Sequence, residues 1–229
     1  MNFIEGETLL VDKPYGWTSF DVVNKLRWAL KQKLKVKKIK VGHAGTLDPL
    51  ATGLLIICTG KNTKKIESLS AEKKGYTGKF LLGKTTPSFD LETEFDEEFS
   101  IDHLNTQTIE EVRKKFIGEI KQRPPLFSAK QIDGKRAYDY ARKGIDLELK
   151  EINVEIEKFE LITDGFPEIE FNIICSKGTY IRSIANDFGK ALNCGATLIE
   201  LRRISSGSSQ IDEAKTVDDW LDIIHKFYI

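Results

Sequence analysis

A carboxylate in a glycine-rich stretch is the group best placed to do chemistry in this chain. Asp48 lies within residues 42–55 (GHAGTLDPLATGLL), with His43 five residues upstream and an apolar run close behind it. The glycines let the backbone come close to a ligand, and Pro49 disfavours helical geometry at the residue before it. We therefore expect Asp48 on a sharp, firmly held turn, as is common for catalytic carboxylates. The competing interpretation is an ordinary Asp-Pro turn without chemistry.

Regular patterns around this stretch predict the elements that would position it. Thr18 and Asp21 have capping-box spacing ahead of a helix over residues 19–31, and Thr108 and Glu111 repeat that spacing before another. The other predicted elements are strands at 8–12, 54–58, 75–82, 152–156, 169–175 and 197–204, and helices at 181–192 and 217–227. Strands and helices mix without strict alternation. This indicates an α+β fold, a largely antiparallel mixed sheet flanked by helices.

Length and composition narrow the class of protein. A chain of 229 residues, 40% hydrophobic, can bury a core as one large domain or two small lobes. It shows no apolar run of membrane-spanning length and no basic-then-apolar leader, so we expect a cytoplasmic protein. Cys58, Cys175 and Cys194 lack metal-ligand spacing and are interpreted as buried free thiols. Three dispersed histidines do not suggest a cluster either, so no metal is expected.

The formal net charge of +0 hides a strong segregation of charge. Residues 25–40 contain eight basic residues and no acid, whereas residues 90–102 contain seven acids and no base. The basic run is either a solvated helix end or a surface for a nucleic-acid backbone. The acidic run is interpreted as a solvated loop. Past the Pro124-Pro125 pair, basic residues alternate with aromatics. We expect a protruding segment there, partly helical over 136–143 and suited to RNA, with an ordinary amphipathic loop as the alternative.

Several stretches, in order, resemble the signature motifs of the TruB family of tRNA pseudouridine synthases. Residues 42–55 match the family's Asp motif almost letter for letter. The other matching stretches are 13–19 (KPYGWTS), 74–76 (KGY), 125–130 (PLFSAK), 134–142 (GKRAYDYAR), 175–182 (CSKGTYIR) and 201–203 (LRR). The resemblance covers roughly residues 8–204, and Trp17 stands where the family usually has methionine.

The resemblance implies a fold, a reaction and a partner. The fold is the pseudouridine synthase catalytic fold, a single domain over 1–229 with a thumb-like insertion at about 121–146 and no C-terminal PUA domain. The reaction is isomerisation of uridine 55 in the T loop of tRNA to pseudouridine. It needs no cofactor, because nothing is oxidised or reduced overall. The expected partner is the tRNA T arm, bound by a monomer that needs no membrane, metal or obligatory partner protein.

The resemblance also assigns Asp48 and two residues around it. Asp48 acts either as nucleophile at the sugar carbon or as base at C2′, and the sequence does not choose between these. Arg182 resembles the family arginine that pairs with this aspartate and keeps it ionised. The alternative for Arg182 is an ordinary salt bridge on the protein surface. His43 resembles the residue that takes the space of the flipped nucleotide, although a structural role is the default for a single histidine.

The remaining assignments concern the uracil pocket. Tyr76 resembles the aromatic that stacks on the target base and whose phenol could help remove the C5 proton. Tyr180 and Leu201 resemble the other pocket walls. Core packing is the alternative for all three. Asp90 resembles an acidic residue of the family's second sheet segment and receives a supporting role.

Two other functions compete with the enzyme hypothesis. A non-catalytic RNA-binding protein that helps tRNA to fold would keep the pocket without the chemistry, and an enzyme with a separate chaperone-like role is the nearer alternative. The retained Asp48, Tyr76 and Arg182 weigh against loss of catalysis. A phosphate-binding P-loop at 60–63 fails, because the upstream glycine and the hydroxyl directly after the lysine are missing.

Overall fold

The chain divides into two units, which are described separately. The structure, a computed structural model, describes residues 1–128, 131–132, 135–136, 140, 145, 147 and 149–227. The first unit comprises Met1–Tyr76 and the segment from Leu201 onward, and the second comprises Thr77–Glu200. The boundaries fall inside strands β4 (Lys74–Leu82) and β12 (Ala196–Ser206). The first unit is therefore built from two separated parts of the sequence.

The first unit is built around strand β3 (Thr52–Thr59), whose residues 53–59 are buried. Strand β1 (Thr8–Lys13) pairs antiparallel with β3 along one edge. Two strands share the other edge of β3. Strand β12 pairs parallel with its start, at Thr52 and Gly53, and β2 (Val41–Ala44) pairs antiparallel with its later residues. The strand order is β14-β1-β3-β12. The short elements that complete this unit are η1 (Gly60–Lys65), α2 (Ile66–Ala71), β13 (Ser209–Gln210), η2 (Ile211–Glu213) and β14 (Lys215–Thr216).

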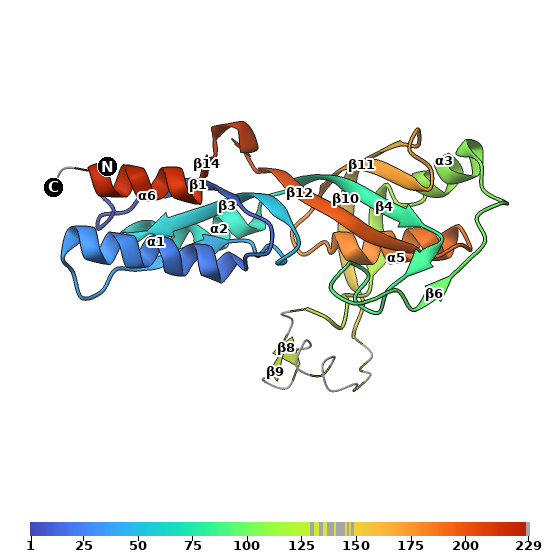
Figure 1. The fold of residues 1–229 in the computed structure, drawn as a ribbon, viewed down its shortest axis with the longest axis horizontal. Helices are drawn as coiled ribbons and strands as arrows, with labels where there is room; N and C mark the ends of the chain where they lie inside the picture. Colours follow the sequence, from blue (N-terminus) through green and yellow to red (C-terminus); the bar gives the residue numbers. More distant parts are fainter. Residues whose placement is uncertain are drawn as a thin grey trace. The chain divides into compact units, whose positions relative to one another are not determined.

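Two long helices cover this sheet segment, α1 (Ser19–Leu34) and α6 (Val217–Lys226), and they lie side by side (Figure 1). Both begin with a capping box, predicted above for α1, in which the threonine hydroxyl accepts the N–H of the aspartate and the aspartate accepts the N–H of the threonine. The α1 residues at helical spacing, such as Leu26 and Leu30, are fully buried. Trp220 of α6 donates its indole N–H to the Leu10 carbonyl at 2.8 Å, which ties α6 to β1.

The second unit is a sheet segment with the order β12-β4-β11-β10-β7. The predicted antiparallel pair is present as β10 (Ile152–Ile162) and β11 (Glu168–Cys175), and β7 (Gly118–Gln122) pairs with β10. Its helices are α3 (Thr106–Lys114) and α5 (Ile181–Ala191), and its short strand pairs are β5 (Lys84–Thr85) with β6 (Glu97–Glu98) and β8 (Gln131–Ile132) with β9 (Lys135–Arg136).

A cluster of phenylalanines forms the core of the second unit. Phe80 of β4 stacks on Phe171 of β11 at 4.4 Å between ring centroids, and Phe188 of α5 meets Phe159 of β10 edge-on at 5.7 Å. These rings bring α5 against three neighbouring strands of the segment. Each buries a large apolar area and adds a geometric preference to the packing. The Phe188 ring thereby packs α5 against β10.

The described elements confirm the predicted α+β fold with a mostly antiparallel sheet, and they correct details. The second capping box was predicted at Thr108, but α3 begins earlier, with the Asn105 side chain accepting the Thr108 N–H at 2.9 Å. Residues 41–44, for which no strand was predicted, form β2, and His43 lies in this strand. The three cysteines are free and buried, as predicted. Most of the predicted thumb over residues 121–146, including the helix expected over 136–143, lies outside the described residues.

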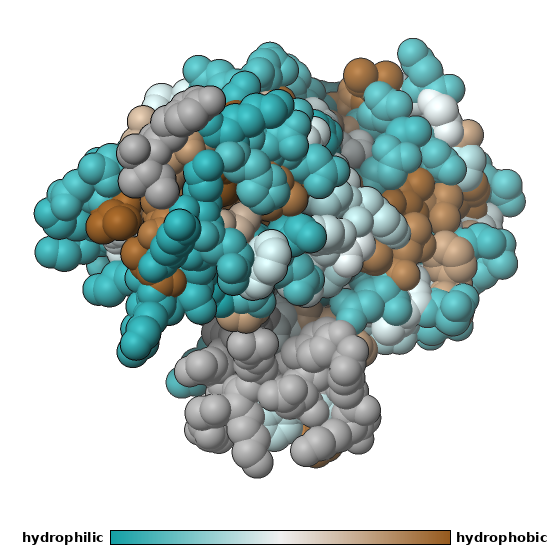
Figure 2. All heavy atoms as spheres, turned by 60° about the vertical axis from the view of Figure 1, so that its left-hand side comes forward, coloured by the Kyte–Doolittle hydropathy of each residue, from teal (hydrophilic) through white to brown (hydrophobic). Residues whose placement is uncertain are grey.

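One face of the described surface is predominantly hydrophilic (Figure 2). Figure 2 shows hydrophilic side chains over most of one face, with separate hydrophobic patches between them. No helix in the described parts of the chain is both long enough and apolar enough to cross a membrane.

Candidate active site

Asp48 lies in a loop of the first unit whose backbone is tied on both sides of the carboxylate. The loop follows β2 and leads into β3, and the Asp48 side chain is partly exposed. Ser19, the first residue of α1, makes two hydrogen bonds to Leu47, the residue before Asp48. Its hydroxyl donates to the Leu47 carbonyl at 3.1 Å and accepts the Leu47 N–H at 2.8 Å. After Asp48, the Ala51 N–H donates to the Asp48 carbonyl at 3.1 Å. The predicted held turn is confirmed.

Lys13 supports the same loop from the end of β1. Its side chain is fully buried, and its ammonium donates to the carbonyls of Trp17 at 2.6 Å, Pro14 at 3.0 Å and Pro49 at 3.3 Å. The Gly16 N–H also donates to the Pro49 carbonyl, at 2.9 Å. Burial lowers the pKa of Lys13 to about 8, and the negative charge of Asp48 opposes that shift. A buried cation therefore acts on the carboxylate while it fixes the next residue.

Arg203 of β12 closes the other side of the loop. Its fully buried guanidinium donates from Nε to the Leu54 carbonyl at 2.6 Å and from Nη2 to the Gly45 carbonyl at 3.1 Å. These two acceptors bracket the segment that contains Asp48. Gly53 lies against the same residue with φ +101°, and a Cβ there would collide with the Arg203 backbone carbonyl. The glycine is therefore required by close packing of β3 against β12.

His43 lies in β2, directly before the loop, and is partly buried. Burial lowers its pKa below the usual value, the positive charge of Arg203 lowers it further, and a backbone hydrogen bond with Gly45 partly opposes the shift. The imidazole is therefore neutral at neutral pH. Its buried Nδ1 has no hydrogen-bond partner within the described part of the chain.

Two more predicted site residues, Tyr76 and Leu201, belong to the first unit. The chain leaves this unit after Tyr76 and returns to it at Leu201. Tyr76 is 9% exposed and lies in β4, and Leu201 is partly buried in β12. Next to Tyr76, a Cβ on Gly75 would press against the Ser205 hydroxyl. Both side chains thus lie on packed strands rather than on loops.

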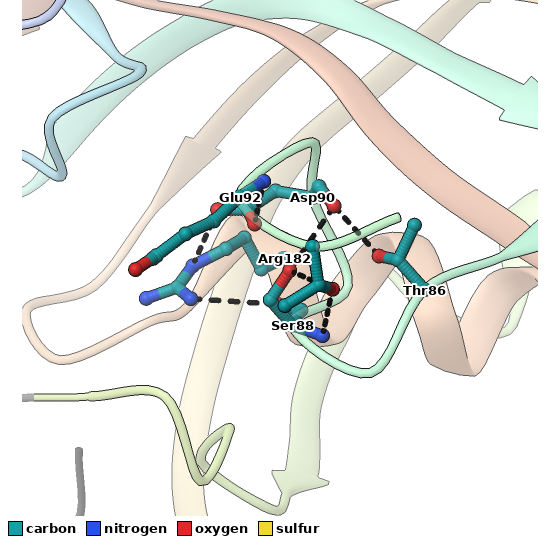
Figure 3. A network of polar contacts seen from close by, with 6 residues as sticks. Thr86, Ser88, Asp90, Glu92 and Arg182 are labelled. Atoms are coloured by element: carbon teal, nitrogen blue, oxygen red, sulfur yellow. Dashed lines mark hydrogen bonds and ion pairs between the residues drawn. The ribbon is translucent and has the colours of Figure 1, made fainter. Parts of the chain in front are cut away.

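In the second unit, Asp90 and Arg182 form a buried ion pair, with 3.5 Å between Oδ2 and Nε. Figure 3 shows the surrounding network. The Asp90 carbonyl accepts the hydroxyls of Thr86 at 2.7 Å and Ser88 at 3.1 Å, and its carboxylate accepts the Glu92 N–H at 3.0 Å. The Arg182 Nη1 donates to the Ser88 carbonyl at 3.4 Å. Asp90 is therefore a buried anchor for Arg182, although it opens the acidic run that was expected to be solvated.

Tyr180 is fixed by a reciprocal pair of bonds with Gln122 at the end of β7. The Gln122 amide donates to the Tyr180 carbonyl at 3.0 Å and accepts the Tyr180 N–H at 2.8 Å. Tyr180 is the residue that precedes the first turn of α5. The Ser183 hydroxyl donates to the Arg123 carbonyl at 2.8 Å and ties the same turn to the chain after β7. The helix start that carries Tyr180 and Arg182 is thus set by β7.

The predicted site residues fall into two groups. Asp48, His43, Tyr76 and Leu201 belong to the first unit, and Tyr180, Arg182 and Asp90 belong to the second. The pairing expected between Asp48 and Arg182 stays a prediction. Sequence reasoning assigned no role to four residues that hold this machinery, namely Lys13, Ser19, Arg203 and Gln122. Lys13, Ser19 and Arg203 lie inside the quoted motifs, and this was the available signal.

Within the described residues, no group of three or more histidine, cysteine, aspartate or glutamate side chains is arranged to hold a metal ion. The charge of buried Lys13 acts on Asp48, buried Arg203 bonds to the carbonyls of Gly45 and Leu54 on either side of it, and neutral His43 precedes the same loop. Such a set can hold a carboxylate ionised and close to a bound ligand. It suits nucleophilic or proton-transfer chemistry at the carboxylate.

Comparison with known proteins shows the class of protein to which this chain belongs. A family model described as the N-terminal domain of TruB family pseudouridylate synthases matches residues 31–181. A second, described as the C-terminal domain of tRNA pseudouridylate synthase B, matches residues 182–227. The chain is a pseudouridylate synthase, an enzyme that isomerises uridine in RNA. It belongs to the TruB family.

Curated relatives agree along nearly the whole chain. The chain is 54% identical over 225 residues to tRNA pseudouridine synthase B of Phocaeicola vulgatus, with 97% of this chain and 96% of the relative covered. It is 53% identical over 213 residues to the protein of the same name from Flavobacterium johnsoniae, with 93% of each covered. Identity at this level and coverage confirms the family that the motifs predicted.

A solved structure supports the fold. The chain is 30% identical to a chain from the crystal structure of a Cbf5-Nop10-Gar1 complex, with a TM-score of 0.72. The match covers 96% of this chain and 54% of the other, so this chain spans about half the length of that structural relative.

Proposed function

We propose that this protein converts uridine 55 in the T loop of tRNA to pseudouridine. The bond between N1 of uracil and C1′ of the ribose breaks, the base turns, and C5 bonds to C1′. One proton leaves C5 and one is taken up at N1, so atoms and electrons balance without an oxidant or reductant. The proposal rests above all on Asp48, a partly exposed carboxylate in a loop tied by Ser19, Lys13 and Arg203.

Asp48 is the proposed catalytic residue. It attacks C1′ as a nucleophile or removes the C2′ proton to give a glycal, and it must be ionised for either step. Lys13 supports the ionised form, since the two charges attract each other in a buried setting. The ties on both sides of the carboxylate reduce the reorganisation needed when substrate arrives.

The target base must leave the RNA stack before it can react, at a cost of a few kcal/mol. We assign His43 to the space that the flipped nucleotide vacates, where the exposed part of its neutral ring can contact RNA without adding charge. Tyr76, Tyr180 and Leu201 are the proposed contacts to the uracil. Arg182, anchored by Asp90, has a supporting role.

We infer that the protein acts on the tRNA T arm as a monomer, without a cofactor or an obligatory partner protein, and in the cytoplasm. We also infer that residues 1–229 act as one catalytic domain, because strands β4 and β12 each contribute to both units. Residues 121–146 are the proposed thumb that closes on RNA.

The test uses a T-arm stem-loop whose uridine 55 carries tritium at C5. Forming the new carbon–carbon bond expels that label, so tritium release reports the isomerisation itself. We expect release by the parent protein and none by Asp48→Asn. Asp222→Asn is the matched control, because it removes the same charge from an exposed position on α6.

Stem-loop binding is measured alongside for all three proteins. Binding without tritium release by the parent would contradict the enzyme proposal and favour a purely RNA-binding role. Release that survives Asp48→Asn would leave the reaction intact and remove Asp48 as its catalytic residue.

A further inference from the structure

A groove of about 310 Å³ lies in the first unit, built from chain that the proposed chemistry does not use. Its apolar walls come from Ile4, Val36 and Ile39, and its basic side chains come from the segment before β2 and from η1. We call this the lysine groove and define its basic rim as Lys38, Lys40 and Lys64. All three side chains are exposed. None of the lining residues is aromatic.

Backbone bonds hold the three segments of the lysine groove together. The Gly60 N–H donates to the Lys40 carbonyl at 2.9 Å, and the Lys61 N–H donates to the Glu5 carbonyl at 3.1 Å. Gly60 has φ +52°, and a Cβ there would collide with the Ile4 carbonyl. The Thr63 hydroxyl closes the turn onto the Gly60 carbonyl at 2.8 Å. The rim lysines therefore project from a fixed frame.

The charge of the rim is not compensated by the rest of the described protein. Lys61, which also lines the groove, pairs with Glu5 at 2.5 Å. Lys38, Lys40 and Lys64 form no ion pair with any residue that the structure describes. Lysines elsewhere differ: Lys79 has three carboxylates within 3.9 Å. Three positive charges gathered around one groove create a local field that favours a polyanion, although the net charge of the chain is +0.

We propose that the lysine groove binds backbone phosphates of tRNA outside the T arm. This rests on the proposed function, which supplies tRNA as the substrate. Lysine ammonium groups neutralise phosphates as point charges and do not read bases, and the absence of aromatic lining fits a backbone contact better than base stacking. The groove thereby adds affinity for whole tRNA without changing which uridine reacts.

The test compares full-length tRNA with a T-arm stem-loop. The variant Lys38→Gln/Lys40→Gln/Lys64→Gln removes the rim charge, and a triple Lys→Arg variant at the same positions keeps it. Lys114→Gln/Lys115→Gln/Lys190→Gln is the charge-matched control, since these three lysines are exposed and belong to the second unit. Dissociation constants are measured over a range of salt concentrations, and tritium release from the stem-loop is recorded for each protein.

We expect the groove variant to bind full-length tRNA roughly tenfold more weakly, with a salt slope lower by about 2–3, because each phosphate contact contributes roughly 0.7–0.9 to that slope. Its stem-loop binding and tritium release stay at parent values, and the Lys→Arg variant binds as the parent does. Unchanged affinity for tRNA would overturn the proposal. So would an equal loss in the control, or an equal loss for both RNAs, which would place the contact within the T arm.

The two proposals fail separately. Tritium release tests the reaction, whereas the lysine groove is judged only on binding. A parent protein that binds tRNA but releases no tritium would contradict the proposed function, and the binding comparison would still decide the role of the groove.

Discussion

Asp48 owes its position to neighbours that bond to backbone atoms around it. Ser19 fixes the residue before it, and Lys13 fixes the residue after it. Arg203 holds the carbonyls of Gly45 and Leu54, which bracket the loop. A side chain on a loop tied in this way loses little freedom when substrate binds, and small displacements of a reacting group cost large factors in rate.

The Ser19 hydroxyl provides a direct test of this positioning. Ser19→Ala removes both bonds to Leu47 and leaves two buried backbone groups without that partner, so stability should fall by about 1–3 kcal/mol. If the bonds place Asp48, kcat should fall about tenfold or more while KM changes little. Steady-state tritium release measures both constants. Ser68→Ala is the control, because it removes one exposed bond from α2. A stability loss with unchanged kcat would contradict the positioning role.

Lys13 predicts a specific dependence of stability on pH. Its folded pKa of about 8 lies below the ordinary value of 10.5, so between these values the unfolded chain binds more protons than the folded one. The contribution of Lys13 to the free energy of unfolding therefore rises with pH in that window. Below the window Lys13 is protonated in both states, so its contribution is at its lowest and no longer changes with pH. Relative to Lys13→Met, the parent should gain about 2 kcal/mol between pH 8 and pH 10. Urea unfolding at several pH values measures the difference. A difference that is constant with pH would contradict the lowered pKa.

At the scale of elements, the sequence predicts those whose pattern is local. The helices α1 and α6 combine a capping box with an apolar stripe, and both were placed correctly. Strand β2 was missed because its glycine and histidine resemble a turn, whereas it is defined by pairing with β3. The short β7 was missed for a similar reason, since its partner β10 lies thirty residues farther along the chain.

The contrast between local patterns and distant partners also divides the site residues into those that the sequence predicts and those that it does not. The motif around Asp48 marks that residue because its neighbours in sequence are distinctive. Lys13, Arg203 and Gln122 bond to Pro49, Gly45 and Tyr180, which are 36, 158 and 58 positions away. No local pattern reports such partners, so their roles become visible only in the fold.

The start of α3 gives a prediction at this scale. The Asn105 side chain accepts the Thr108 N–H, so Asn105→Ala should lower stability by about 0.5–2 kcal/mol. Thr108→Ala should cost less, roughly 0.5 kcal/mol or below, because it leaves that cap in place and loses only an exposed hydroxyl contact. Urea unfolding of both variants gives the comparison. A larger effect at Thr108 would restore the cap that the sequence pattern suggested.

At the scale of the whole molecule, the first unit is discontinuous in sequence. Residues 1–76 supply β1, β2, β3 and α1, but the part of β12 from Leu201 onward, β14 and α6 come from the C-terminal part of the chain. The late segment contributes buried groups, including Trp220 with its bond to the Leu10 carbonyl and the Arg203 guanidinium with its two bonds across the loop. The loop that carries Asp48 is therefore incomplete until the C-terminal part of the chain is present.

This arrangement predicts how fragments behave. Residues 1–76 made alone should not fold cooperatively, because α6 no longer covers β1. Burial of Trp220 and of Ile224 each contributes about 1.5–3 kcal/mol to the free energy of unfolding, and the fragment lacks both side chains. Residues 77–200 are continuous and contain their own phenylalanine core, so they should show a cooperative unfolding transition. Circular dichroism during urea titration distinguishes the two. A sharp transition in the 1–76 fragment would show that the Asp48 loop and its sheet segment form without β12 and α6.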